Sequence, residues 1–189
     1  MKVAVLYGST RSERQGIKAA KFVVNSVNER GNEAILLDAL EIDLPFLDKM
    51  YKELGDDAPM NMKQTAETLK NADGILVISG EWNHSIPPAL KNLLDHFQSE
   101  YHWKPSGIIT YSAGPFGGVR VAPHLRAITG ELGMPSISSM FPISKVGSSF
   151  DERGNALDDA YPRRIKRFLQ EFEWYMEAFK ARRDQGTPY

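Results

Sequence analysis

The chain alternates between short apolar runs and longer stretches in which apolar positions recur with helical spacing. The apolar runs are rich in β-branched residues and end at turn residues, which is typical of strands. They cover residues 2–7, 34–37, 74–79, 107–111 and, more weakly, 137–143. The helical stretches cover residues 15–30, 60–71, 88–100, 119–132 and 161–182. Because strands that are apolar throughout need burial on both faces, the pattern predicts an α/β fold: a doubly wound five-stranded parallel sheet with helices on both faces.

The length of the chain bounds its domain organisation. A chain of 189 residues, 42% of them hydrophobic, is long enough for one well-buried core but short for two domains of ordinary size. We therefore expect a single domain at residues 1–183, followed by a frayed C-terminal tail at residues 184–189. Residues 144–160 contain several Gly and Ser and are expected to form a long loop.

Composition narrows the range of partners. The chain has 23 Lys and Arg against 24 Asp and Glu, so no overall charge favours nucleic acid or an anionic membrane. The absence of cysteine excludes disulfides, thiolate metal sites and a cysteine nucleophile. The N-terminal run is typical of a strand rather than a signal peptide, and no apolar run is long enough to span a membrane. We expect a cytoplasmic protein with no nucleic-acid partner, no membrane insertion and no metal, since the four histidines lack metal-ligand spacing.

In such a sheet, ligands bind beyond the carboxyl ends of the strands, so the loops after the first, third and fourth strands carry the candidate residues. The first loop, GSTRSERQG at residues 8–16, leads from a strand into a helix. Its backbone N–H groups, hydroxyls and helix N-terminus suit a phosphate, and two arginines add charged donors. The candidate ligands here are Ser9, Thr10, Arg11, Arg14, Gln15 and Gly16.

A second interpretation of this loop is purely structural. Ser9 and Ser12 could cap the helix while the arginines lie in solvent. Neither the nucleoside-triphosphatase motif GxxxxGK[ST] nor the dinucleotide fingerprint GxGxxG is present. If this loop binds a phosphate, we therefore expect a monoester.

The second loop reads GEWNHSIPP at residues 80–88. Ser85 is placed to cap the following helix, and the two prolines favour its first turn. Capping does not explain Trp82 and Asn83, which could instead flank a flat heterocycle and hydrogen-bond its edge. The alternative is that Trp82 packs on the neighbouring helix.

The third loop, residues 112–120, contains three glycines within five residues, Gly114, Gly117 and Gly118. Such a cluster is costly in entropy unless the backbone adopts positive φ or approaches a ligand closely. Ser112 opens this loop and adds a hydroxyl.

Together these loops carry a resemblance to a known family. The motifs are G-S-x-R after the first strand, the pattern P-E-Y-N-x-S-x-P-x-x-L-K-N-x-x-D after the third, and S-x-G-x-x-G-G after the fourth. The chain resembles the NADPH-dependent FMN reductase family of flavodoxin-like flavoproteins, which includes quinone, azo and chromate reductases. The resemblance implies the strand order 2-1-3-4-5. Here Gly80 replaces the usual proline, Trp82 the usual tyrosine, and Arg14 stands where many relatives have a hydroxyl.

The resemblance also implies which residues hold the cofactor FMN. The phosphate would be bound by Ser9, Arg11 and the N–H groups that follow. The isoalloxazine ring would be lined by Glu81, Trp82 and Asn83. Its pyrimidine side would lie against Ser112, Gly114 and Gly117. No side chain is expected to act as a catalytic acid, base or nucleophile.

The implied function is an FMN-dependent NAD(P)H oxidoreductase. Hydride would pass from NADPH or NADH through flavin N5 to a small oxidant, in a ping-pong order; quinone, free flavin, azo compound and metal oxyanion all remain open. The alternatives are a flavodoxin-type one-electron carrier, against which the near-zero net charge counts, and a low-turnover flavin-binding regulator. The family often joins subunits near the flavin, which implies a homodimer or homotetramer; ordinary core packing of the same apolar stripe is the alternative.

Overall fold

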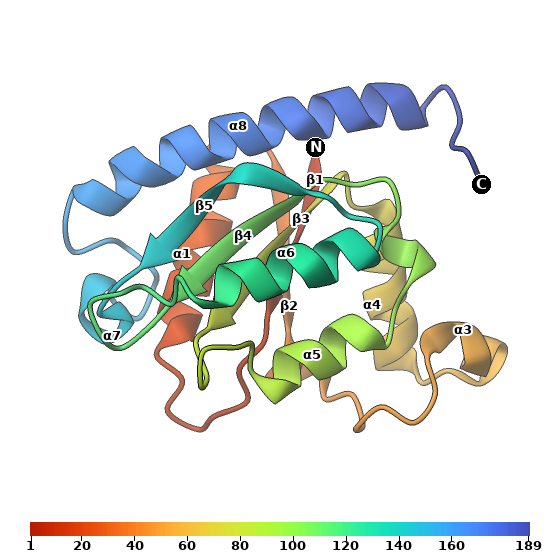
Figure 1. The fold of residues 1–189 in the computed structure, drawn as a ribbon, viewed down its shortest axis with the longest axis horizontal. Helices are drawn as coiled ribbons and strands as arrows, with labels where there is room; N and C mark the ends of the chain where they lie inside the picture. The colour runs from red at the N-terminus through yellow and green to blue at the C-terminus, as the bar shows by residue number, and fades with distance from the viewer.

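A single parallel sheet of five strands organises the protein. The computed structural model describes residues 1–189, and its strands lie in the order β2-β1-β3-β4-β5 (Figure 1). The strands are β1 (Lys2–Tyr7), β2 (Glu33–Asp38), β3 (Gly74–Gly80), β4 (Ser106–Tyr111) and β5 (Ser136–Ile143). The predicted fold class, strand count and strand order are confirmed.

Helices cover both faces of the sheet. One face carries α1 (Gly16–Asn28) and α8 (Ala160–Arg183), which runs the length of the sheet in Figure 1. The other face carries α4 (Met60–Asn71), α5 (Pro88–Asp95) and α6 (Val121–Glu131). The short helices are α2 (Ala39–Ile42), α3 (Tyr51–Leu54) and α7 (Val146–Ser149), with 3-10 turns at Gly55–Asp57 and Ser99–Tyr101. None of these helices combines the length and hydrophobicity needed to cross a bilayer.

Two hydrophobic clusters fill the space between the sheet and its helices. Val3, Val5 and Tyr7 of β1 face α1 and α8, whereas Ala4 and Leu6 face α4, α5 and α6. This alternation follows from the two-residue period of a strand. All seven residues of the central strand β3 are buried, which accounts for its continuous apolar sequence.

The helix predicted at residues 88–100 is shorter than expected. It ends at Asp95, and a separate 3-10 turn follows at Ser99–Tyr101. The carbonyl of His96 accepts a hydrogen bond from the N–H of Tyr51 at 2.8 Å, so it does not continue the helical ladder. The break allows the chain to turn back toward β4.

The loop predicted at residues 144–160 is also only partly correct. This segment contains α7 and an isolated bridge between Phe150 and Ala156. The ring of Phe150 is buried, with its centroid 4.7 Å from that of Phe22 and 5.2 Å from that of Tyr161. Gly and Ser content suggested an open loop, but one buried aromatic ring anchors the segment to the core.

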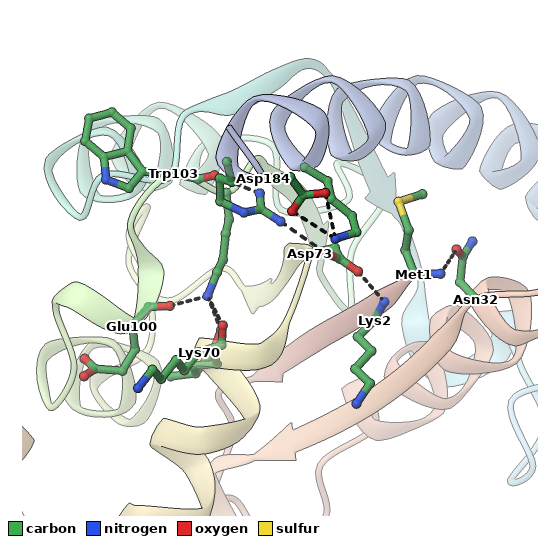
Figure 2. A network of polar contacts seen from close by, with 12 residues as sticks. Met1, Lys2, Asn32, Lys70, Asp73, Glu100, Trp103 and Asp184 are labelled. Atoms are coloured by element: carbon green, nitrogen blue, oxygen red, sulfur yellow. Dashed lines mark hydrogen bonds and ion pairs between the residues drawn. The ribbon is translucent and has the colours of Figure 1, made fainter. Parts of the chain in front are cut away.

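Figure 2 shows a polar network around Lys2 and Asp73, which lie at the amino ends of β1 and β3, at the opposite edge of the sheet from the candidate loops. Asp73 accepts a hydrogen bond from the backbone N–H of Lys2 at 2.9 Å and pairs with the Arg183 guanidinium at 3.2 Å. Arg183 also donates to the carbonyl of Trp103 at 2.9 Å. Beyond α8, the Tyr189 ring packs edge-on against Trp103 with centroids 5.0 Å apart.

Lys104 is the buried cation of this network. Its ammonium donates to the carbonyl of Leu69, to that of Lys70 at 2.9 Å and to that of Glu100 at 2.7 Å, and so caps the last turn of α4. Burial, and secondarily the charge of Arg183, lowers the pKa of Lys104 from 10.5 to about 8. The lowered pKa means that the ammonium is less favourable in the folded protein than in water.

The stability of the protein therefore depends on pH through Lys104. Between about pH 8 and 10.5 the unfolded chain holds a proton that the folded protein has lost, so this lysine contributes more stability as pH rises. Relative to Lys104→Met, the wild type should gain about 1–2 kcal/mol in unfolding free energy between about pH 7.5 and 9.5. Urea denaturation at both pH values checks this, and a pH-independent difference would contradict the assigned pKa.

Candidate functional site

The carboxyl ends of β1, β3 and β4 meet at one edge of the sheet. Tyr7 at the end of β1 is in register with Ile78 of β3, and Gly80 at the end of β3 is in register with Tyr111 of β4. The chain leaves β1 toward β2 and returns to form β3 on the other side, so the strand order reverses between β1 and β3. Loops after these strands therefore surround a switch point, where parallel sheets bind ligands.

The loop after β1 presents unpaired backbone donors. The N–H groups of residues 9–15 donate no main-chain hydrogen bond, and α1 begins directly afterwards at Gly16. Gln15 occupies the N-cap position of α1, and no side chain makes a capping hydrogen bond there. The structural alternative, in which Ser9 and Ser12 cap the helix, is therefore wrong. These donors and the positive end of the α1 dipole form a site for an anion.

Arg14 supports this loop from beneath. Its guanidinium forms an ion pair with Asp38, the last residue of β2, and both side chains are nearly buried. It also donates to the carbonyl of Ser9 at 3.0 Å and lies 5.5 Å from the ring centroid of Tyr7. Asp38 in turn accepts from the N–H of Leu40 at the start of α2 at 3.0 Å. Arg14 thus fixes the shape of the loop, and its charge is already neutralised.

Arg11 is the cation of the loop that forms no ion pair with a carboxylate of the chain. Its guanidinium lies 6.0 Å from the ring centroid of Trp82, in the loop after β3. Trp82 is 41% exposed and belongs to neither hydrophobic cluster, so it lies at the surface rather than in the core. Arg11 and Trp82 therefore face each other across the edge of the sheet.

The loop after β3 contains a tight two-residue turn. Trp82 and Ser85 exchange two main-chain hydrogen bonds of 2.9 and 2.8 Å, and Asn83 and His84 between them have φ of 48° and 65°. Asparagine tolerates this left-handed conformation, as expected in a primed turn. The predicted capping role of Ser85 is wrong: α5 starts at Pro88 with Pro87 in the cap position.

Ser85 instead joins this loop to α6. Because it closes the turn, it lies too early in the chain to reach the first N–H groups of α5. Its hydroxyl is 2.9 Å from Nδ1 of His124. The carboxylate of Glu81 makes a second link, accepting from the Arg120 guanidinium at 3.2 Å, while the Glu81 N–H donates to the carbonyl of Tyr111 at 3.2 Å.

The glycines after β4 meet different needs. Gly117 and Gly118 have φ of 65° and 71°, and a Cβ on Gly118 would lie 2.5 Å from the carbonyl oxygen of Tyr111. Positive φ, one of the two predicted reasons for this cluster, is thus confirmed. A Cβ on Gly114 would meet nothing within 4 Å, so that position faces open space. Ser112 donates to the carbonyl of Gly114 at 3.0 Å, which closes this part of the loop.

Not all predicted residues lie together. Arg11, Trp82 and Glu81 approach the common edge through the contacts described. The Gln15 side chain lies beside Gly147 of α7, and a Cβ on Gly117 would be 3.0 Å from Pro142 of β5. These last two positions face the β5 side of the site.

Sequence reasoning missed four contributors to the site: Tyr7, Asp38, Tyr111 and His124. Three of them are the last residues of strands β1, β2 and β4. Their position at the carboxyl end of a strand could have marked them as candidates in the sequence. His124 lies one turn inside α6 and carries no comparable signal. No group of three or more His, Asp or Glu side chains is arranged to hold a metal ion.

The residues present fit a flavin phosphate. The unpaired N–H groups of residues 9–15 and the unpaired charge of Arg11 match a phosphate, while the half-exposed Trp82 ring offers a flat surface beside it. A cavity of about 490 Å³ lies between α1 and α8, but its lining lacks these features. The sheet order and the anion-binding loop define a flavodoxin-like protein.

The comparison with known sequences identifies the family. The chain belongs to the NADPH-dependent FMN reductase family, whose sequence model matches residues 1–147. It is an oxidoreductase with FMN as cofactor and NAD(P)H as reductant.

Individual relatives agree with this assignment. A quinone reductase of Pseudomonas putida is 30% identical over 179 residues, which span 90% of this chain and 89% of the relative. A 2-hydroxy-1,4-benzoquinone reductase of a Burkholderia species is 26% identical, over 91% and 94% of the two chains. The structure of FerB, a flavoenzyme NAD(P)H:(acceptor) oxidoreductase from Paracoccus denitrificans, superposes with a TM-score of 0.78 at 24% identity, covering 94% of this chain and 98% of FerB.

The ion pair beneath the first loop should dominate local stability. Asp38→Ala leaves the nearly buried Arg14 guanidinium without its partner and should lower the unfolding free energy by about 3 kcal/mol. The matched control is Glu41→Gln, which loses only a 3.6 Å contact to the same arginine from a side chain that is 75% exposed. That variant should change stability by less than about 0.5 kcal/mol in urea denaturation. Equal effects of the two substitutions would contradict the role given to Asp38.

Proposed function

We propose that this chain transfers electrons in pairs from NAD(P)H to a quinone through FMN bound at the three loops. The carrying observation is the run of unpaired N–H groups at residues 9–15 beside Arg11, since this arrangement suits a phosphate monoester. The quinone is favoured as oxidant because two relatives that match along nearly their whole length bear quinone-reductase names. Free flavin, azo compounds and metal oxyanions are further candidate oxidants, because each could reach the same exposed face of the flavin.

The chain's own residues bind and orient. Ser9, Thr10 and Gly16 bring backbone and hydroxyl donors to the phosphate, and Arg11 supplies the charge. Arg14 holds that loop in shape through Asp38. Preorganised donors of this kind cost no rearrangement when the ligand binds.

The other two loops bind the flat ring. Glu81 and Arg120 tie the loop after β3 to the loop after β4, which fixes the distance between the two walls. Trp82 and Asn83 form one wall, and the backbone from Ser112 to Gly117 forms the other. Main-chain N–H groups near the pyrimidine side stabilise negative charge there.

When bound, FMN supplies the redox chemistry, accepting a hydride from the nicotinamide at N5 and passing two electrons to the oxidant. We propose a ping-pong order, in which NAD(P)⁺ leaves before the oxidant binds at the same open face. The exposed rim at Trp82 and Phe116, 41% and 64% exposed, supports a site that admits more than one flat partner. NADPH and NADH both fit this proposal, since no side chain is assigned to a 2′-phosphate.

A one-electron carrier and a low-turnover regulator are the competing functions. Carriers of the flavodoxin type dock through strongly acidic surfaces, whereas this chain has a net charge of −1 and carries Arg11 at the site without a carboxylate partner. Sustained two-electron turnover with a quinone separates the reductase from both.

We further propose that the protein assembles as a homodimer or homotetramer in the cytoplasm. The exposed aromatic rings at the rim of the site support an additional subunit contact there. Sedimentation velocity measures the assembly directly, and a monomer at all concentrations would contradict it.

The purified protein should bind one FMN per chain and oxidise NADPH only slowly until a quinone such as benzoquinone is added. Initial-rate patterns with both substrates varied should be parallel lines, as a ping-pong order requires. Bound FMN without NAD(P)H oxidation would favour the carrier or regulator, and intersecting lines would contradict the kinetic order.

Arg11→Ala should weaken FMN binding by about 10- to 100-fold, because it removes a charge-assisted contact to the phosphate. Riboflavin lacks that phosphate, so its affinity should stay the same. Arg163→Ala, on α8 and outside the three loops, is the matched control and should bind FMN as the wild type does. Quenching of flavin fluorescence measures the affinity of each variant for FMN and for riboflavin. Unchanged FMN affinity in Arg11→Ala would contradict the assignment of Arg11 to the phosphate.

A further inference from the structure

Tyr7 is the last residue of β1 and stands directly before the phosphate loop. Its side chain is fully buried on the α1 side of the sheet. The polar groups around it are the hydroxyls of Ser9 and Tyr111 and the guanidinium of Arg14, which lies 5.5 Å from its ring centroid. Its polar neighbours thus belong to the first loop or to the end of β4.

The hydroxyl of Tyr7 makes no hydrogen bond of normal geometry within the chain. The hydroxyls of Ser9 and Tyr111 are the groups close enough to affect its pKa through side-chain contact. A buried hydroxyl left without a partner is unfavourable by about 1–3 kcal/mol. Burial also raises the pKa of Tyr7 far above its ordinary value, so the hydroxyl keeps its proton and remains a donor at any physiological pH.

Two glycines make room for the tyrosine pair. A Cβ on Gly16, the first residue of α1, would lie 2.3 Å from the Tyr111 ring, and a Cβ on Gly80 would lie 2.9 Å from it. The Tyr111 ring therefore occupies the space between the end of β3 and the start of α1, with its centroid 6.2 Å from that of Tyr7. This packing gives a physical reason for Gly80, which stands where the family pattern has proline.

The phosphate loop is where an acceptor for this donor would arrive. Tyr111 covers Tyr7 from the β4 side and Arg14 lies over its ring. The loop above presents the unpaired N–H groups of residues 9–15 and the guanidinium of Arg11, and its one carboxylate, Glu13, is exposed. A run of unpaired N–H groups beside a guanidinium without a carboxylate partner suits an anion as its occupant. A phosphate has oxygens enough to accept from several of these groups at once.

We propose that the Tyr7 hydroxyl donates a hydrogen bond to the phosphate of bound FMN, which makes Tyr7 a phosphate-binding residue that the family motifs do not mark. The inference rests on the proposed function, because it requires FMN at the first loop. It deepens that function by adding a neutral donor from the floor of the site to the charged donor Arg11 at its rim.

The test compares Tyr7→Phe with the wild type, using FMN and riboflavin as probes. Tyr7→Phe keeps the ring and should weaken FMN binding about tenfold, while riboflavin affinity changes by less than about twofold. The matched control is Tyr101→Phe, because Tyr101 is equally buried and its hydroxyl is equally unpartnered, but it lies in the opposite hydrophobic cluster. This control should bind both ligands as the wild type does.

Two further measurements separate binding from folding. The ligand-free Tyr7→Phe protein should melt no lower than the wild type, because it loses a hydroxyl that has no internal partner. The phosphorus-31 resonance of bound FMN should shift in Tyr7→Phe and not in Tyr101→Phe.

Four outcomes would overturn the inference. They are unchanged FMN affinity in Tyr7→Phe, an equal loss for riboflavin, an equal loss in Tyr101→Phe, or a clearly lower melting temperature of the ligand-free Tyr7→Phe protein. If the wild type binds FMN and Tyr7→Phe matches it, only this inference fails. If the wild type binds no FMN, the proposed function fails with it.

Discussion

The parallel arrangement of β1, β3 and β4 is the constraint on which the rest of the structure depends. Parallel strands end at the same edge, so three loops far apart in sequence must emerge side by side. The sheet is held by apolar burial on both faces, and β3, which carries the middle loop, is buried along its whole length. A strand that is buried along its whole length therefore positions the middle loop.

Electrostatics then fixes the shape of each loop. Arg14 and Asp38 neutralise each other beneath the first loop, and Glu81 and Arg120 link the second loop to the third. Because carboxylates of the chain neutralise Arg14 and Arg120, Arg11 is the one of these three arginines whose charge is available to a ligand. A protein with near-zero net charge can thus build a locally positive, donor-rich site.

Much of the fold was predictable from the sequence, because the strand pattern is nearly continuous and the loop motifs are specific. The boundaries were less so: the early end of α5 depends on a contact between His96 and Tyr51, which lie far apart in sequence. The roles of Arg14 and Ser85 could not be predicted from the sequence for the same reason, because their partners Asp38 and His124 come from other elements. Tyr7 looked like an ordinary strand residue, and only its unpartnered hydroxyl sets it apart.

Hydrogen–deuterium exchange of the protein with and without FMN tests most directly whether the three loops form one cofactor site. FMN should slow exchange at residues 8–16, 80–87 and 112–118 together, because the ligand would cover their backbone N–H groups. Exchange at the cavity between α1 and α8, around Asn25 and Lys166, should stay unchanged. Protection confined to that cavity, or protection of one loop without the other two, would contradict a single FMN site at the carboxyl edge of the sheet.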